Sequence, residues 1–395
     1  MSREVKNVSR QVLNLSREVK NVSREVKNVS RQVPDFSREV LDVSGQVFYL
    51  SGPKRGWSRQ LGAKNFTPPE LPTASIFAPL TPPTRGDSPF LVSHFSLIMD
   101  DIYRSAGGRR LIHDLYRRHL AELDVPLSEC MVATELGDTH VVTYGRHDAT
   151  PILCFHGEYL TGPLAMRPFI EGLDLERVRL LVPDVPGAVG FSLGRRLSAS
   201  KGEYGRWALQ VMEALGLRGC TVLAWSQGAR IALQLCETAV LSVSRLMLVQ
   251  PAGFASTSLA RTDRLLSART PDLDRLQLSD QAVQRALEPA LNFEAPDLLE
   301  MARLIYLYLR PEPEEWREVK KKSLDKFRAP VGIVACKSDC LFPGDEVVKH
   351  ARRVVPFMEM SRVVDLGCHC GLFADTDVAH EAIAVVSDFL LRGTD

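Results

Sequence analysis

A serine at position 226 has the sequence surroundings of a catalytic nucleophile. It stands in Ala224-Trp225-Ser226-Gln227-Gly228, after an apolar run and before a stretch, 229–237, with the pattern of a helix. A serine on a sharp turn between a strand and a helix is presented for attack, and small neighbours let that turn pass close to both elements. Gly190-Phe191-Ser192-Leu193-Gly194 is a stricter match, but no strand ends directly before Ser192 and a polar loop follows it. We therefore predict Ser226 as the nucleophile; the simpler alternative is a serine that caps the next helix.

A serine hydroxyl needs a base to take its proton and an acid to orient that base. In chains with this type of turn, both partners follow the serine, on loops after later strands. Asp339 comes just after an apolar run, and His369 stands in the glycine-flanked loop 367–371, between the last strand and the last helix that we expect. We predict Asp339 as the acid and His369 as the base. Asp365 and Asp345 are weaker candidates for the acid, and a turn aspartate is the simpler reading of Asp339.

Two backbone N–H groups are needed to bind the oxyanion that forms during acyl transfer. One is expected from Gln227, the residue after the nucleophile, and the other from Glu158, in the loop after the early apolar run 152–155. Gly157 would let this loop approach the serine closely. We expect the side chain of His156 to support the loop by hydrogen bonding.

Four cysteines flank the predicted acid and base: Cys336, Cys340, Cys368 and Cys370. Two alternatives follow from them, a zinc site and a thiol pair whose oxidation blocks the catalytic residues. The spacings differ from the usual Cys-x2-Cys pairs, and our primary interpretation contains no metal and no cofactor.

The composition is that of a water-soluble globular protein. Of 395 residues, 45% are hydrophobic and 25% are charged, and the net charge is +1, which gives no general attraction to nucleic acid or to membranes. No run of 18 apolar residues predicts a membrane span. The eight cysteines form no disulfide framework and favour a reducing compartment. We expect a cytoplasmic protein, while an Arg- and Ser-rich N-terminus leaves organelle targeting open.

The first 50 residues form a low-complexity arm with a seven-residue repeat. Ser-Arg-Glu-Val-Lys-Asn-Val occurs at 2–8, 16–22 and 23–29, and its valines alternate spacings of three and four. This heptad pattern is typical of a coiled coil, which would allow self-association, but serine-rich positions and Pro34 equally favour a disordered arm. Residues 51–94, rich in Pro, Gly, Ser and Thr, are predicted to be a linker.

From about residue 95 to 393, strand-like and helix-like stretches alternate. A helical pattern over 97–123, broken at Gly107-Gly108, precedes a hairpin of 131–134 with 139–144. This alternation predicts an α/β fold with a mostly parallel sheet covered by helices on both faces. The segment 254–328 is too long for one crossover and is predicted to be a helical lid over an apolar pocket. The expected strands are 152–155, 179–182, 220–224, 246–249, 331–335 and 363–366, and helical patterns cover 204–215, 231–238 and 380–391.

Together these motifs resemble the α/β-hydrolase superfamily. The resemblance rests on His156-Gly157, the stretch Asp184 to Ser192, the turn at Ser226, the Asp339 loop and Gly367-x-His369. The start of the body, from Met99 to Thr134, is similar to bacterial-type carboxylesterases, although Ala224 stands where glycine is usual. The resemblance implies an α/β-hydrolase fold and cleavage of carboxylic esters by a Ser-Asp-His triad without a metal.

We therefore expect a serine hydrolase that cleaves a small-molecule ester through an acyl-enzyme intermediate. The same three residues could instead cleave amides, thioesters, lactones or carbon–carbon bonds, and the sequence does not separate these reactions. A protein that keeps the fold for binding or as a scaffold, without catalysis, is the alternative from another class.

Overall fold

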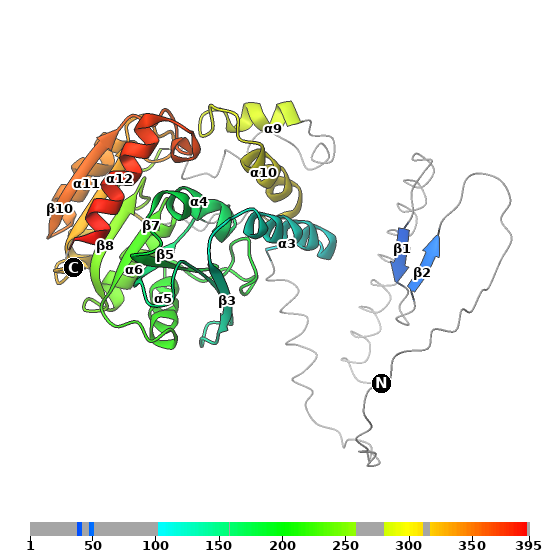
Figure 1. Cartoon of the computed structure of the whole chain (residues 1–395), viewed down its shortest axis with the longest axis horizontal. Coiled ribbons are helices and arrows are strands. Elements are labelled where there is room, and N and C mark those ends of the chain that lie inside the picture. Colours follow the sequence, from blue (N-terminus) through cyan, green and yellow to red (C-terminus); the bar gives the residue numbers. More distant parts are fainter. Residues whose placement is uncertain are drawn as a thin grey trace, which may run out of the picture. The chain divides into compact units, whose positions relative to one another are not determined.

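The computed structural model describes residues 38–41, 47–50, 102–157, 159–257, 280–310 and 317–392. Two units are distinguished, Met1–Thr84 and Arg85–Asp395. In the first, strands β1 (Arg38–Leu41) and β2 (Val47–Leu50) pair in antiparallel register (Figure 1). The sequence did not indicate these strands at the end of the repeat arm. The heptads before them and the linker lie outside the described residues, so the coiled-coil and disordered alternatives both stay predictions.

The second unit is built on an eight-stranded sheet with the order β10-β9-β8-β7-β5-β6-β4-β3. Its strands from β5 to β10 run parallel, whereas β4 pairs antiparallel with both β3 and β6. The mostly parallel sheet expected from the alternating pattern is thereby confirmed. The strands are β3 Leu127–Val132, β4 Thr139–Tyr144, β5 Thr150–Phe155, β6 Val178–Pro183, β7 Cys220–Trp225, β8 Val243–Val249, β9 Val331–Cys336 and β10 Met358–Val364.

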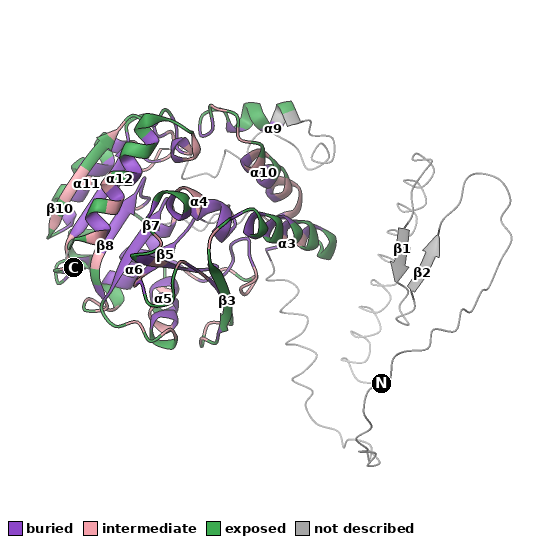
Figure 2. Ribbon diagram, viewed as in Figure 1, coloured by how far each residue is buried: buried purple, intermediate pink, exposed green. Residues whose placement is uncertain are grey.

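Helices cover both faces of this sheet, as predicted (Figure 2). Alternation along β5 shows why: Leu153 and Phe155 belong to one core cluster, while Ile152 and Cys154 belong to the cluster on the opposite face. The first cluster packs the sheet against α5 (Glu203–Ala214), α6 (Gly228–Thr238) and α11 (Gly344–Val354). The second packs it against α3 (Ala106–Ala121), α4 (Gly162–Gly172) and α12 (Asp377–Leu391).

Two edge strands were placed wrongly from the sequence. The last strand, β10, covers Met358–Val364 rather than 363–366, and the first strand of the hairpin, β3, begins at Leu127 rather than 131. These strands form the two ends of the sheet, and most of their residues are partly or fully exposed. An edge strand that is not buried lacks the apolar pattern by which the inner strands were found.

The first helix also differs from its prediction. It begins at Ala106, where Ser105 caps it by accepting a hydrogen bond from the N–H of Gly108 at 3.0 Å. Gly107 and Gly108 lie inside its first turn, so the predicted break at these glycines was wrong. Gly108 is needed for packing, because an added Cβ would lie 2.4 Å from the ring of Tyr308, the last residue of the helix Pro296–Tyr308.

Two helices stand between β8 and β9, where the helical insertion was expected. They are α9 (Asp280–Leu287) and α10 (Pro296–Tyr308), and they form a third apolar cluster with α3. Residues 258–279 and 311–316 of this insertion lie outside the described residues. Its extent over 254–328 and its role as a lid stay predictions. Two short 3-10 turns, Lys321–Ser323 and Gly371–Phe373, complete the described helical elements. Among the described helices, none has both the length and the apolar character that crossing a membrane would require.

Candidate active site

Ser226 lies on the predicted turn between a strand and a helix. Strand β7 ends at Trp225, helix α6 begins at Gly228, and the backbone of Ser226 has a φ of 56°. A left-handed conformation is strained for a residue other than glycine and persists only where the surroundings hold it. Here the N–H of Ser226 donates to the carbonyl of Val249 at 3.0 Å, and the carbonyl of Ser226 accepts from the N–H of Ala252 at 3.0 Å.

The three residues predicted as nucleophile, base and acid form one chain of hydrogen bonds. The Oγ of Ser226 lies 2.9 Å from the Nε2 of His369, and the Nδ1 of His369 lies 2.7 Å from the Oδ2 of Asp339. A carboxylate accepts, so Nδ1 carries the ring proton and Nε2 faces the serine hydroxyl with its lone pair. The side chains of His369 and Asp339 are only 6% and 0% exposed, so water competes little for these bonds. The arrangement can remove the serine proton and hold the resulting imidazolium.

The structure separates the three candidate acids. Asp339 is fixed by its other oxygen, Oδ1, which accepts from the N–H groups of Leu341 and Phe342 at 2.8 and 2.9 Å. Asp365 is exposed and accepts from the hydroxyl of Ser338 at 2.7 Å, a hydrogen bond that lowers the pKa of its carboxyl. Asp345 lies in the first turn of α11. Of these carboxylates, Asp339 is the one that hydrogen-bonds His369.

Two aromatic rings that the sequence analysis did not single out enclose the imidazole. The ring of Trp225 stacks on His369 at a centroid distance of 5.5 Å and an interplanar angle of 23°, and Phe342 meets it edge-on at 5.5 Å. Both residues are close in sequence to a predicted catalytic residue, which was the available signal. Stacking and edge contacts limit how far the imidazole can rotate.

The expected oxyanion site is described in part. Gln227 is the first residue before α6, and the first N–H groups of a helix have no acceptor within the helix. Gly157 runs past the nucleophile, because an added Cβ there would lie 3.7 Å from the Oγ of Ser226. His156 is buried, which lowers its pKa, and its Nδ1 lies 2.7 Å from the carbonyl of Gly157. This contact is the loop support expected of His156. Glu158 lies outside the described residues, and its role stays a prediction.

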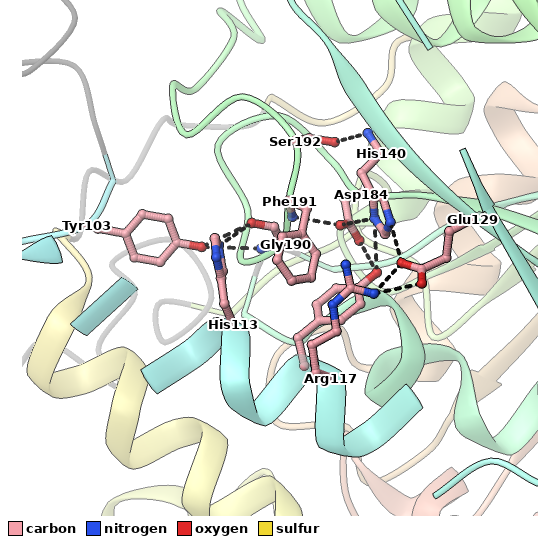
Figure 3. Close-up of polar contacts among 10 residues, drawn as sticks. Tyr103, His113, Arg117, Glu129, His140, Asp184, Gly190, Phe191 and Ser192 are labelled. Atoms are coloured by element: carbon pink, nitrogen blue, oxygen red, sulfur yellow. Dashed lines mark hydrogen bonds and ion pairs between the residues drawn. The ribbon is translucent and has the colours of Figure 1, made fainter. Parts of the chain in front are cut away.

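The rival serine, Ser192, belongs to a different network (Figure 3). Its Oγ accepts from the backbone N–H of His140 at 2.9 Å. The ring of His140 lies between two carboxylates, 2.9 Å from Asp184 and 2.7 Å from Glu129. Burial alone would lower the pKa of His140, but hydrogen bonds and charges from Asp184 and Glu129 outweigh it and raise that pKa. Sequence reasoning missed this network.

The hydrogen bonds around His140 and Asp184 hold a loop in place. Asp184 is fully buried and also accepts from the hydroxyl of Tyr116 at 2.9 Å and from the N–H of Phe191 at 2.8 Å. An added Cβ on Gly190 would lie 2.5 Å from this carboxyl group. These hydrogen bonds attach the stretch from Asp184 to Ser192 to β4 and α3. Among the described residues, the Ser192 hydroxyl bonds the backbone of His140 and not the nitrogen of an imidazole ring.

The four cysteines near the site are free thiols. Burial raises the pKa of Cys336 to about 11 and that of Cys340 to about 12, and it also raises the pKa of Cys368 and Cys370. Thiols of this kind stay protonated near neutral pH and react slowly with oxidants. Across the described ranges, no group of three or more His, Cys, Asp or Glu side chains is placed to hold a metal ion.

The comparisons with known proteins bear on this geometry. A family model described as the alpha/beta hydrolase fold matches residues 150–326, which include strand β5 and the turn at Ser226. The chain has the α/β-hydrolase fold. An uncharacterized carboxylesterase of Bacillus subtilis is 25% identical over 116 residues, which are 29% of this chain and 38% of that relative. The match thus spans well under half of that relative's length.

Solved structures resemble this chain over more of its length. The carboxylesterase CesB of Bacillus subtilis is 16% identical with a TM-score of 0.60, and the alignment covers 73% of this chain and all of CesB. Naproxen esterase of the same organism is 17% identical with a TM-score of 0.58, with 71% of this chain and 96% of that esterase covered. At these identities the likeness shows the fold.

Proposed function

We propose that this α/β hydrolase cleaves small carboxylic esters through an acyl-enzyme intermediate. The observation that carries the proposal is the hydrogen-bonded chain from Ser226 through His369 to the buried Asp339. A serine that caps a helix requires no imidazole at its hydroxyl, whereas the hydroxyl of Ser226 faces an imidazole that a buried carboxylate orients.

The reaction follows from the positions of these atoms. The Nε2 of His369 takes the proton of Ser226 as Oγ attacks the ester carbonyl carbon, and the carbonyl π electrons move onto oxygen. The N–H of Gln227 and, as we propose, that of Glu158 bind this oxyanion. Collapse of the tetrahedral intermediate breaks the bond to the alcohol, which receives the proton from His369. Water, activated by the same imidazole, then releases the acid and restores the Ser226 hydroxyl.

Asp339 contributes by charge and by orientation. Its carboxylate holds the Nδ1–H of His369 at 2.7 Å, so the free lone pair is directed at the serine. When the imidazole becomes positive, the buried carboxylate stabilises that charge in surroundings that water scarcely reaches. Two backbone N–H groups that donate to its other oxygen hold the Asp339 side chain in place.

The choice of ester as the substrate class draws on the named relatives, which are carboxylesterases and an esterase. Cleavage of amides, thioesters, lactones or carbon–carbon bonds is the alternative for the same residues. We retain the cytoplasm as the predicted location. A scaffold role without catalysis is the second candidate, since self-association through the N-terminal repeats would suit an assembly.

A matched pair of serine variants tests the proposal. Ser226→Ala is expected to lower turnover of p-nitrophenyl esters by about 10⁴-fold or more. Ser192→Ala, in the stricter Gly-x-Ser-x-Gly match, is expected to keep turnover within a few-fold of the parent protein. Labelling by a fluorophosphonate probe should disappear in the first variant and persist in the second. A folded parent protein that is not labelled at Ser226 would favour the scaffold, whereas loss of turnover in Ser192→Ala alone would reverse the assignment.

A panel of esters graded by acyl length, with Ser226→Ala as the blank, measures which acyl groups the protein accepts. A cleft of about 490 Å³ lies between α4, α10 and α12, but none of the three proposed catalytic residues lines it.

A further inference from the structure

Gln250 is a buried polar residue that no step of the proposed reaction uses. It follows directly on strand β8, is 0% exposed and has a φ of 45°. Besides Ser226 it is the only residue other than glycine with a positive φ in the described part of the chain. Two strained residues side by side, on neighbouring strand ends, indicate a backbone that is held in place for a purpose.

The side chain of Gln250 joins the segment of the nucleophile to the segment of the base. Its Oε1 accepts from the indole N–H of Trp225 at 3.2 Å, and its Nε2 donates to the carbonyl of Cys368 at 3.3 Å. Trp225 precedes Ser226, and Cys368 precedes His369. The indole N–H can only donate and the carbonyl can only accept, so a neutral amide is the side chain that satisfies both.

The backbone around Gln250 contacts the serine segment a second time and also contacts the strand that precedes Asp339. Its neighbours on β8 and in the following turn bind both ends of the serine: Val249 accepts from the Ser226 N–H, and Ala252 donates to the Ser226 carbonyl, each at 3.0 Å. The N–H of Gln250 donates to the carbonyl of Val334 at 2.6 Å, on strand β9, which leads into the Asp339 loop. One residue therefore contacts the segments that carry all three proposed catalytic groups.

We propose that Gln250 is a positioning residue that sets the placement of the His369 imidazole relative to the Ser226 hydroxyl. It acts through Trp225, whose ring stacks on the imidazole, and through Cys368, whose carbonyl fixes the start of the His369 loop. The inference rests on the proposed function of Ser226 and His369. Loss of the amide frees the indole N–H and the Cys368 carbonyl together, so both supports of the imidazole loosen at once.

The test compares two buried glutamines with the same bonding. Gln250→Met keeps length and flexibility but removes both hydrogen bonds. Gln234→Met is the matched control, because Gln234 also accepts one N–H, from Gly205 at 3.3 Å, and donates to one carbonyl, that of Ala199 at 2.7 Å. Both variants are expected to lower the melting temperature to a similar extent.

Only Gln250→Met is expected to change the chemistry. We expect its kcat for a p-nitrophenyl ester to fall about 10- to 100-fold with KM changed less than about threefold, because a misplaced catalytic group slows the chemical step more than binding. Fluorophosphonate labelling should slow by a similar factor. The pH at which kcat/KM falls on the acid side of its pH profile should also shift. The downfield proton signal of the His369 Nδ1–H should move in Gln250→Met and stay in place in Gln234→Met.

Trp225→Phe is the second test variant, for use if Gln250→Met does not fold. It removes the indole N–H together with part of the ring but keeps the hydrogen bond from Gln250 to Cys368, so we expect a smaller loss of kcat and a shift of the same proton signal. Unchanged kcat and an unmoved signal in a folded Gln250→Met or Trp225→Phe protein would overturn the proposal. The signal also separates the two hypotheses: if the parent protein cleaves no ester of the panel but the signal still moves in Gln250→Met, the positioning role stands and the ester function fails.

Discussion

Replacing Gly228 by alanine should displace the turn that carries Ser226, because the added methyl group has no room. Gly228 is the first residue of α6, and an added Cβ would lie 2.1 Å from the carbonyl oxygen of Phe155 and 2.5 Å from its carbon. Phe155 ends β5, an inner strand paired on both sides, so its backbone has little room to withdraw. The start of α6 must therefore move instead.

The size of the effect follows from that distance. Ordinary van der Waals contact begins near 3.4 Å, so the two groups must separate by about 1.3 Å. This displacement carries Gln227 and Ser226 with it, and a misplacement of about 1 Å can cost about 100-fold in rate. We expect kcat/KM for a p-nitrophenyl ester to fall about 100-fold, and overpacking to lower the free energy of unfolding by about 1–3 kcal/mol.

The control is Gly107→Ala, on the exposed side of the first turn of α3. An added Cβ there meets no atom within 4 Å. Alanine has a higher helix propensity than glycine, so the free energy of unfolding should rise by up to about 1 kcal/mol while turnover stays unchanged. Ester kinetics and urea unfolding measured on both variants decide the matter. Parent-like kcat/KM and stability in Gly228→Ala would show that the turn tolerates a methyl group and would refute the steric argument.

Three further outcomes are expected elsewhere in the molecule. Folding raises the pKa of His140 above its ordinary value of 6.5, so the protonated imidazole stabilises the folded protein. This stabilisation is complete below pH 6.5 and is lost as the pH rises through the folded pKa, so the free energy of unfolding should decline over that range. Urea titrations at several pH values should show this decline, and a His140→Gln protein that declined equally would contradict it. Gly205→Ala should cost about 1–3 kcal/mol, since its Cβ would lie 2.6 Å from the carbonyl of Gln234, while folded protein keeps its specific activity. Millimolar peroxide should leave ester turnover intact, because burial raises the pKa of Cys340 to about 12; inactivation reversed by a thiol reductant would support the oxidation hypothesis instead.

The inner strands could be predicted because a buried strand consists of consecutive apolar residues, which are visible in the local sequence. A parallel strand covered on both faces reads as an unbroken apolar run, and β5, β7 and β9 were found in this way. The edge strands β3 and β10 carry polar and exposed residues, so the apolar runs beside them misled the placement. Parts of the predicted lid and Glu158 fall outside the described residues, so the extent of the lid and the role of Glu158 rest on sequence alone.

The sequence by itself determined the order of the chemical groups: a serine on a strand-to-helix turn, then an aspartate loop, then a histidine loop. The sequence is enough for this, because each group is identified from the residues next to it in the chain. Only the tertiary structure decided which aspartate reaches the imidazole, because Asp339 and His369 are separated by 30 residues and Ser226 and His369 by 143. The same holds for the Gln250 bridge and for the carboxylates around His140. Buried polar side chains find partners across the fold, and such pairings leave no periodic pattern in the chain that carries them.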